Sequence, residues 1–154
     1  MSPPKSLIDL KDILYYFLVV RHTPFDINKT ISYWLEGAKY DMGTAEDIIT
    51  TGRYPYALFM AHMALEKALK ALYVKRTGRH APRTHSLTLL ARHFKNEIPK
   101  NFMEQLAGYS TFHVQTRYPD YLYEFYDQCT EQFTKDTVEE MRGMFEWLTR
   151  RLNG

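Results

Sequence analysis

Several cationic side chains in the middle of this chain have types and spacings that could bind phosphate groups. Lys67 and Lys70 stand three residues apart, a spacing that places both on one face of a helix. His85 and Arg117 follow further along the chain and could donate further hydrogen bonds to an anion. RNA cleavage without a metal needs such cations, together with a group that deprotonates a 2′-hydroxyl. These residues therefore indicate either phosphate binding or phosphodiester cleavage.

The charges are unevenly distributed along the chain, although the formal net charge is only +2. Between positions 67 and 96 there are eight lysines and arginines and no aspartate or glutamate. Between positions 120 and 146 there are eight aspartates and glutamates. This asymmetry indicates a phosphate-bearing partner for the basic stretch or, with equal weight, pairing of the two stretches across the fold or a dimer.

Each of these side chains also has a purely structural interpretation. Glu66 stands four residues before Lys70, so the lysine face could be a solvated helix surface that carries an ion pair. His85 follows Thr84 at the expected start of a helix, where its ring could hydrogen-bond the neighbouring backbone instead of a phosphate or base. His62 stands four residues before Glu66 and could pair with it, but a position at the helix surface or an interface is the preferred interpretation.

The segment TRYPD at 116–120 carries the remaining candidate site residues. Arg117 could stabilise the charge of a phosphorane, but the base would have to come from elsewhere, for instance from a second copy of the chain. Alternatively, Arg117 and Asp120 hold the Tyr118–Pro119 turn through local hydrogen bonds. The aromatic residues between 118 and 126 could stack on bases or clamp this segment onto the core. Arg117 is the one catalytic candidate, and the ligand-binding candidates are Lys67, Lys70, His85, Arg117, Tyr118 and Asp120.

Other kinds of site have no signature in the sequence. The histidines, the acids and the single Cys129 show no metal-ligand spacing, and there is no glycine-rich phosphate-binding loop. We therefore expect no metal and no cofactor. One cysteine cannot form an internal disulfide, so a cytoplasmic location is expected. The longest apolar run, residues 13–20, is too short to span a membrane, and we expect it to lie in a buried helix.

The element expected to position most of these groups is a helix over residues 57–75. Alanines at 57, 61, 64, 68 and 71 form one line along it, which would let a neighbouring helix approach closely. The remaining face mixes aromatic, sulfur-containing and charged groups, unlike an ordinary solvated surface. We expect that face to form a homodimer interface through Phe59, Met63 and Tyr73.

Helical periodicity extends over almost the whole chain. Other helices are expected at 6–21, at 28–51 with a cap at Asn28 or Thr30, at 84–96, at 102–112, and from a cap at Thr134 or Asp136 onward. The stretch 116–126 is expected to be irregular. The sequence predicts one all-α bundle domain over residues 28–154, preceded by an N-terminal extension, residues 1–27, that adds a further helix.

Three sequence landmarks stand in a characteristic order: AHMALEKALKALY at 61–73, THSL at 84–87 and TRYPD at 116–120, with GRYPYALF upstream. This order resembles the HEPN domain (higher eukaryote and prokaryote nucleotide-binding) over roughly residues 31–152. The resemblance implies an up-and-down four-helix bundle with a short additional helix, usually assembled as a dimer. It also implies a role as an RNA-cleaving toxin, a nucleotide-binding module or the partner of a small nucleotidyltransferase.

The RNA-cleaving members of this family carry an Arg that is followed a few residues later by a His. Arg117 stands at the corresponding place here, but no His follows it, and His113 precedes it. We therefore expect a non-catalytic, dimeric nucleotide- or RNA-binding module that acts beside a nucleotidyltransferase, in a pair of the toxin–antitoxin type. The alternatives are a metal-independent endoribonuclease toxin that uses Arg117, and a pure protein-interaction module.

Overall fold

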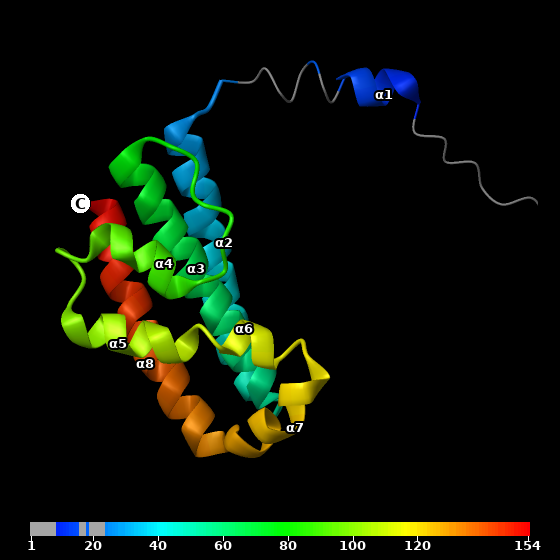
Figure 1. Cartoon of the computed structure of the whole chain (residues 1–154), viewed down its shortest axis with the longest axis vertical. Helices are drawn as coiled ribbons and strands as arrows, with labels where there is room; N and C mark the ends of the chain where they lie inside the picture. Colours follow the sequence, from blue (N-terminus) through cyan, green and yellow to red (C-terminus); the bar gives the residue numbers. More distant parts are fainter. Residues whose placement is uncertain (1–8, 16–17, 19–23) are drawn as a thin grey trace, which may run out of the picture.

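Three long helices form the frame of the molecule. The computed structural model describes residues 9–15, 18 and 24–154, with only the backbone described for 119–122. Helices α2 (Ile27–Ile49), α3 (Tyr54–Thr77) and α8 (Glu131–Asn153) lie side by side, and α2 runs opposite to the other two (Figure 1). The described residues contain helices and no strand, so the predicted all-α class is confirmed.

Shorter helices return the chain from the end of α3 to the start of α8 (Figure 1). This segment takes the place of a fourth long helix, and the up-and-down order of the bundle is thereby completed. It comprises α4 (Leu87–Ala91), the 3-10 helix η2 (Arg92–Phe94), α5 (Lys100–Tyr109), α6 (Phe112–Gln115) and α7 (Pro119–Gln128).

Side-chain caps fix where the long helices begin. The Asp26 carboxylate accepts a hydrogen bond from the backbone N–H of Lys29 at 2.9 Å, so α2 starts earlier than the predicted caps. The Thr130 hydroxyl accepts from the backbone N–H of Phe133 at 3.2 Å, so α8 also starts earlier than predicted. Thr134, a predicted cap, is instead fully buried inside α8. At its other end, α3 stops at Gly78, whose φ of 63° is the left-handed conformation expected of a glycine cap.

The core forms around α3, as the alanine line predicted. All five alanines of the line are fully buried, and α3 packs against both α2 and α8. Small side chains let these helices approach closely, which buries the leucines beside the line as well. Helix α8 contributes an apolar seam at helical spacing, and each of its members is buried: Val138, Met141, Phe145, Leu148 and Leu152.

The expectation of an irregular stretch at 116–126 is wrong, because most of it forms α7. Pro119 occupies the first turn of this helix, where a proline needs no backbone N–H and its fixed φ suits the start. Phe125 is only 1% exposed and packs against Phe112, with 5.7 Å between the ring centroids. This aromatic anchor gives a short helix the tertiary contact that it needs to form.

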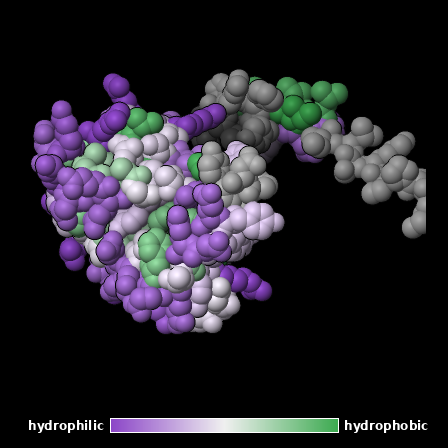
Figure 2. Space-filling model, turned by 60° about the horizontal axis from the view of Figure 1, so that its bottom comes forward, coloured by the Kyte–Doolittle hydropathy of each residue, from purple (hydrophilic) through white to green (hydrophobic). Residues whose placement is uncertain are grey.

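The N-terminal helix α1 (Leu10–Tyr15) is shorter and more exposed than the sequence predicted. The prediction of a buried helix is wrong for the described part of the run, because Ile13 is 42% and Leu14 is 53% exposed. Figure 1 shows the reason, since α1 lies apart from the bundle, and Figure 2 shows it as an apolar patch beside a mostly hydrophilic face. The predicted start of this helix at position 6 lies outside the described residues. Within the described part of the chain, α1 included, no helix has the length and apolar character needed to cross a membrane.

Candidate functional site

The polar residues at the centre of the mixed face of α3 are buried inside a single chain, which corrects the expectation that His62 lies at the helix surface. His62 is fully buried, Glu66 is 2% exposed and Lys70 is 7% exposed. The helix contacts α2 on one side and α4 and α6 on another, so neighbouring elements cover these polar groups. Charged groups are rarely buried unless they are paired, so each one requires a partner within the fold.

Glu66 joins a lysine and a histidine from two different segments. One carboxylate oxygen lies 2.6 Å from Lys70 Nζ, and the other lies 3.1 Å from His85 Nδ1. Lys70 Nζ also lies 5.1 Å from the centre of the Trp34 ring, which reaches it from α2. The predicted i,i+4 ion pair therefore exists, but it is a buried pair and not a solvated one. His85 binds this carboxylate, whereas the sequence had favoured a bond to the neighbouring backbone.

Lys67 forms a second ion pair, which crosses to α2. Its Nζ lies 2.7 Å from Asp41 Oδ2, and Asp41 is only 5% exposed. Gly37 leaves room for the lysine, because a Cβ at that position would lie 3.3 Å from Lys67 Cδ. Both lysines that were proposed as phosphate contacts thus have their charge balanced by a carboxylate within the fold.

Three histidine rings meet beside Glu66. The rings of His62 and His113 stack with 5.0 Å between centroids, and the rings of His85 and His113 lie 5.4 Å apart. His113 Nδ1 lies 2.9 Å from the backbone oxygen of Ser110, which fixes that ring on α6. We call the set Lys70, Glu66, His85, His113 and His62 the histidine network.

His62 is the member of the network that has the most perturbed environment. Neither ring nitrogen makes a hydrogen bond of ordinary geometry. Burial lowers the pKa of His62 from 6.5 to about 4, although the negative charge of Glu66 opposes this shift. The His62 imidazole is therefore neutral over the physiological pH range.

Arg117 lies at the open edge of the histidine network. Its guanidinium carbon is 5.2 Å from the centre of the Phe59 ring, and the side chain is exposed. Phe59 and His62 are three residues apart on α3, and they contact Arg117 and His113, which are four residues apart on the facing segment. The cation therefore sits beside the histidines, in the reverse order of the Arg-then-His motif.

The other residues of the TRYPD segment are more peripheral. Tyr118 is 56% exposed and stands just before α7. Asp120 lies in the first turn of α7, and its side chain is outside the described part of the structure. Tyr123 and Tyr126 are exposed, whereas Phe125 is buried, so the aromatic group divides between surface and core.

The proposed interface residues are half-buried. The Arg117 guanidinium lies over the Phe59 ring. The rings of Tyr73 and His93 meet edge to face with 4.8 Å between centroids. Met63 lies next to His62 on the same helix.

Reasoning from the sequence missed Asp41, Trp34 and His113 as members of the site. The signal for His113 was its spacing of four residues before Arg117, which places the two side chains on one side of a helical turn.

The acidic partners of the basic stretch come from outside the acidic stretch. Among the described side chains, the ion pairs of residues 67–96 join Asp41, Glu66 and Glu97, and none joins an acid of residues 120–146. Pairing of the two stretches within one chain is therefore not seen in this part of the structure.

The described residues also include no cluster of three or more His, Cys, Asp or Glu side chains that could hold a metal ion.

Comparison with known proteins identifies the family. The model of the HEPN domain matches residues 31–152, the range over which the sequence landmarks suggested the resemblance. TT1696 from Thermus thermophilus has a similar structure with a TM-score of 0.68 and 22% identity, over 78% of this chain and 96% of that one. The structure of ST0689, described as an archaeal HEPN homologue, has a TM-score of 0.64 and 23% identity, over 79% of this chain and 97% of that one. No curated protein matches the chain. The family match covers most of the sequence and both structures share its fold, so this chain belongs to the HEPN domain family.

Proposed function

We propose that this protein is a nucleotide- or RNA-binding HEPN module whose phosphate contacts are Arg117 and His85. The observation that carries the proposal is the pairing of Lys67 and Lys70 with carboxylates of the fold. Asp41 and Glu66 balance Lys67 and Lys70, so these lysines support the site and contribute little net charge to a ligand. His85 has a side chain that is 52% exposed, and the Arg117 side chain is exposed as well. These two groups are therefore accessible to an anion from solvent.

The proposal predicts a selective loss of RNA binding when Arg117 is replaced. Arg117→Ala is expected to weaken the binding of a short single-stranded RNA about tenfold, and to lower the slope of log affinity against log salt by about one unit. Fluorescence anisotropy at several salt concentrations measures both quantities. The matched control is Arg142→Ala, because Glu139 and Glu146 already pair with that arginine. Equal affinities for wild type and Arg117→Ala would remove Arg117 from the site.

A second candidate function is metal-independent RNA cleavage, which the contact between Glu66 and His85 favours. A carboxylate at Nδ1 orients the ring and holds the proton on that nitrogen, which leaves Nε2 able to accept the proton of a 2′-hydroxyl. Arg117 would then stabilise the developing phosphorane charge. Incubation with RNA in excess EDTA decides between the candidates. We expect binding without cleavage; cleavage that disappears in both His85→Ala and Arg117→Ala would establish the nuclease instead.

We also propose that the module works as a homodimer, with a small nucleotidyltransferase as its partner protein. Met63 is half-buried and adjoins the histidine network, so a second chain that packs there would lie beside the phosphate contacts. Sedimentation velocity is expected to show a dimer that Met63→Glu converts to a monomer, because a carboxylate opposes burial at an interface. Glu36→Gln, at an exposed position on α2, is the control. A wild-type protein that stays monomeric at every concentration would refute the interface.

A further inference from the structure

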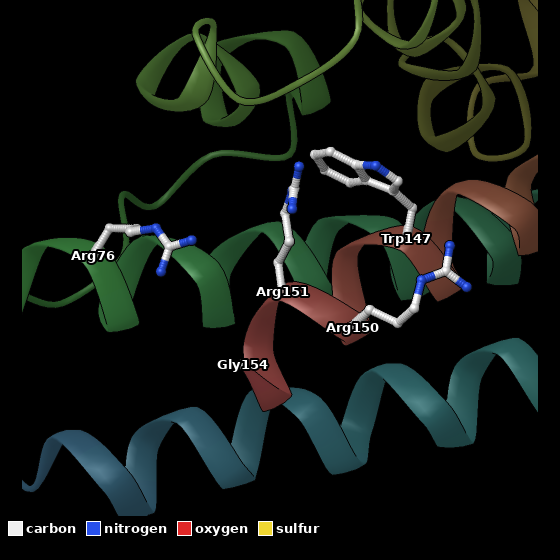
Figure 3. A pocket seen from close by; sticks show the side chains of 5 residues that line it. All are labelled: Arg76, Trp147, Arg150, Arg151 and Gly154. Carbon is white, nitrogen blue, oxygen red and sulfur yellow. The ribbon is translucent and has the colours of Figure 1, made fainter.

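A group of arginines lines a pocket at the end of the bundle that lies away from Arg117. The pocket has a volume of about 410 Å³ and is lined by Arg76 from α3 and by Trp147, Arg150, Arg151 and Gly154 from the end of α8. Figure 3 shows Arg151 rising from α8 beside the Trp147 ring, while Arg76 extends toward them from α3. Because an α-helix rises about 1.5 Å per residue, Arg76 lies roughly 25 Å along α3 from Phe59 and Arg117. This pocket is therefore separate from the exposed Arg117 at the edge of the histidine network.

The pocket carries more positive charge than its acidic neighbour balances. Glu97 pairs with Arg76 through two hydrogen bonds, of 3.1 Å and 2.9 Å. Among the described side chains, no carboxylate lies within ion-pair distance of Arg150 or Arg151. Glu97 thus pairs with Arg76, while Arg150 and Arg151 have no ion-pair partner among the described side chains, and this excess of positive charge favours the binding of an anion.

One of these arginines has an unsatisfied buried donor. The Nε atom of Arg151 is buried and has no hydrogen-bond partner. Its guanidinium carbon lies 3.9 Å from the centre of the Trp147 ring, so stacking fixes the plane of the group. A buried N–H without an acceptor is unfavourable, and an anion in the pocket would supply the acceptor.

The backbone around this pocket is also held in place. Lys75 Nζ donates to the backbone oxygen of Leu152 at 2.7 Å and lies 3.4 Å from that of Arg151. This contact offsets the partial negative charge at the carboxyl end of α8, which would otherwise repel an anion. The rings of Trp147 and Phe102 meet edge to face with 5.6 Å between centroids, which also supports the indole. The arginines are therefore presented from a rigid support.

We propose that this pocket binds a phosphate group, carried either by a nucleotide or by an RNA chain, at a site separate from that of Arg117. Planar guanidinium groups bind phosphate oxygens through paired hydrogen bonds, which suits this group better than a carboxylate or chloride. One face of the indole is occupied by Arg151, so recognition rests on the phosphate and not on base stacking. The site does not depend on the function proposed for the histidine network.

The two tryptophans of the chain allow each site to be observed separately. Trp147 lies in the arginine pocket, and Trp34 lies beside Lys70 at the histidine network. The variant Trp34→Phe therefore leaves Trp147 as the one fluorescent indole. Titration of this variant with pyrophosphate, ATP and a short RNA is expected to change the Trp147 emission saturably. A response to ATP and pyrophosphate identifies a nucleotide site, and a response to RNA alone identifies a backbone site.

Substitutions in the pocket test the assignment. In the Trp34→Phe background, Arg150→Ala is expected to weaken the response at least tenfold without disturbing the stack on Trp147. Arg151→Lys keeps the positive charge but loses the planar set of guanidinium N–H donors, and it should weaken the binding of the phosphate probes by a similar factor. Arg142→Ala, whose arginine is already paired with Glu139 and Glu146, should leave the affinity unchanged. The proposal is overturned if no phosphate probe gives a saturable change, or if Arg150→Ala and Arg151→Lys, both checked for cooperative unfolding, bind as tightly as the parent.

Discussion

Replacing Glu66 with alanine is expected to destabilise the protein by about 3–5 kcal/mol, the usual effect of breaking a buried ion pair from one side. The substitution removes the carboxylate that lies 2.6 Å from Lys70 Nζ, and the Lys70 side chain is only 9% exposed in the intact protein. It also removes the contact of His85 Nδ1. Urea denaturation at pH 7 measures the change in the free energy of unfolding.

A double substitution separates the buried charge from the loss of packing. Glu66→Ala combined with Lys70→Met removes both charges and keeps an unbranched apolar side chain beside Trp34. The double variant is expected to be more stable than Glu66→Ala alone, because no uncompensated charge remains in the core. Glu104→Ala is the matched control, since its pair with Lys100 has the same i,i+4 spacing but is largely exposed. If the losses of stability in Glu66→Ala and in Lys70→Met simply add in the double variant, an uncompensated buried charge is not the cause of the destabilisation.

The frame of the bundle could be predicted because it depends on local periodicity. The alanine line of α3 and the apolar seam of α8 repeat at helical spacing, and both are buried as that spacing requires. The exposure of α1 could not be predicted, because its apolar residues resemble a core segment and only the tertiary structure shows that none of them is buried. Helix α7 was missed for the converse reason, since one distant contact of Phe125 stabilises a polar, tyrosine-rich segment.

The candidate site was only partly predictable for a physical reason of the same kind. Lys67, Lys70, His85 and Arg117 could be singled out from residue type and family motifs. Apart from Glu66, their partners could not, because Asp41 pairs with Lys67 across two helices and Trp34 lies over Lys70 from α2. Sequence spacing places side chains on a face of one helix. The net charge of that face depends also on the side chains that neighbouring helices place against it.

Acidification is expected to destabilise the protein through His62. The folded-state pKa of this ring is lowered to about 4 by burial, whereas the unfolded chain has a value of about 6.5. Between these values the unfolded state binds a proton that the folded state does not, so the free energy of unfolding falls as the pH drops from 6.5 to 4. The stabilisation is complete above pH 6.5 and is lost by about pH 4. The shift corresponds to a loss of about 3 kcal/mol across this window.

The variant His62→Phe isolates this contribution, because phenylalanine keeps a ring that can stack on His113 and does not titrate. Urea denaturation of both proteins at closely spaced pH values gives two profiles of the free energy of unfolding, and their difference isolates the contribution of position 62. The wild-type curve is expected to fall about 3 kcal/mol further than the variant curve between pH 6.5 and 4. His93→Phe, at an exposed ring, should instead follow the wild type. Parallel profiles for wild type and His62→Phe would mean that folding does not shift the pKa of His62 and would refute the burial effect.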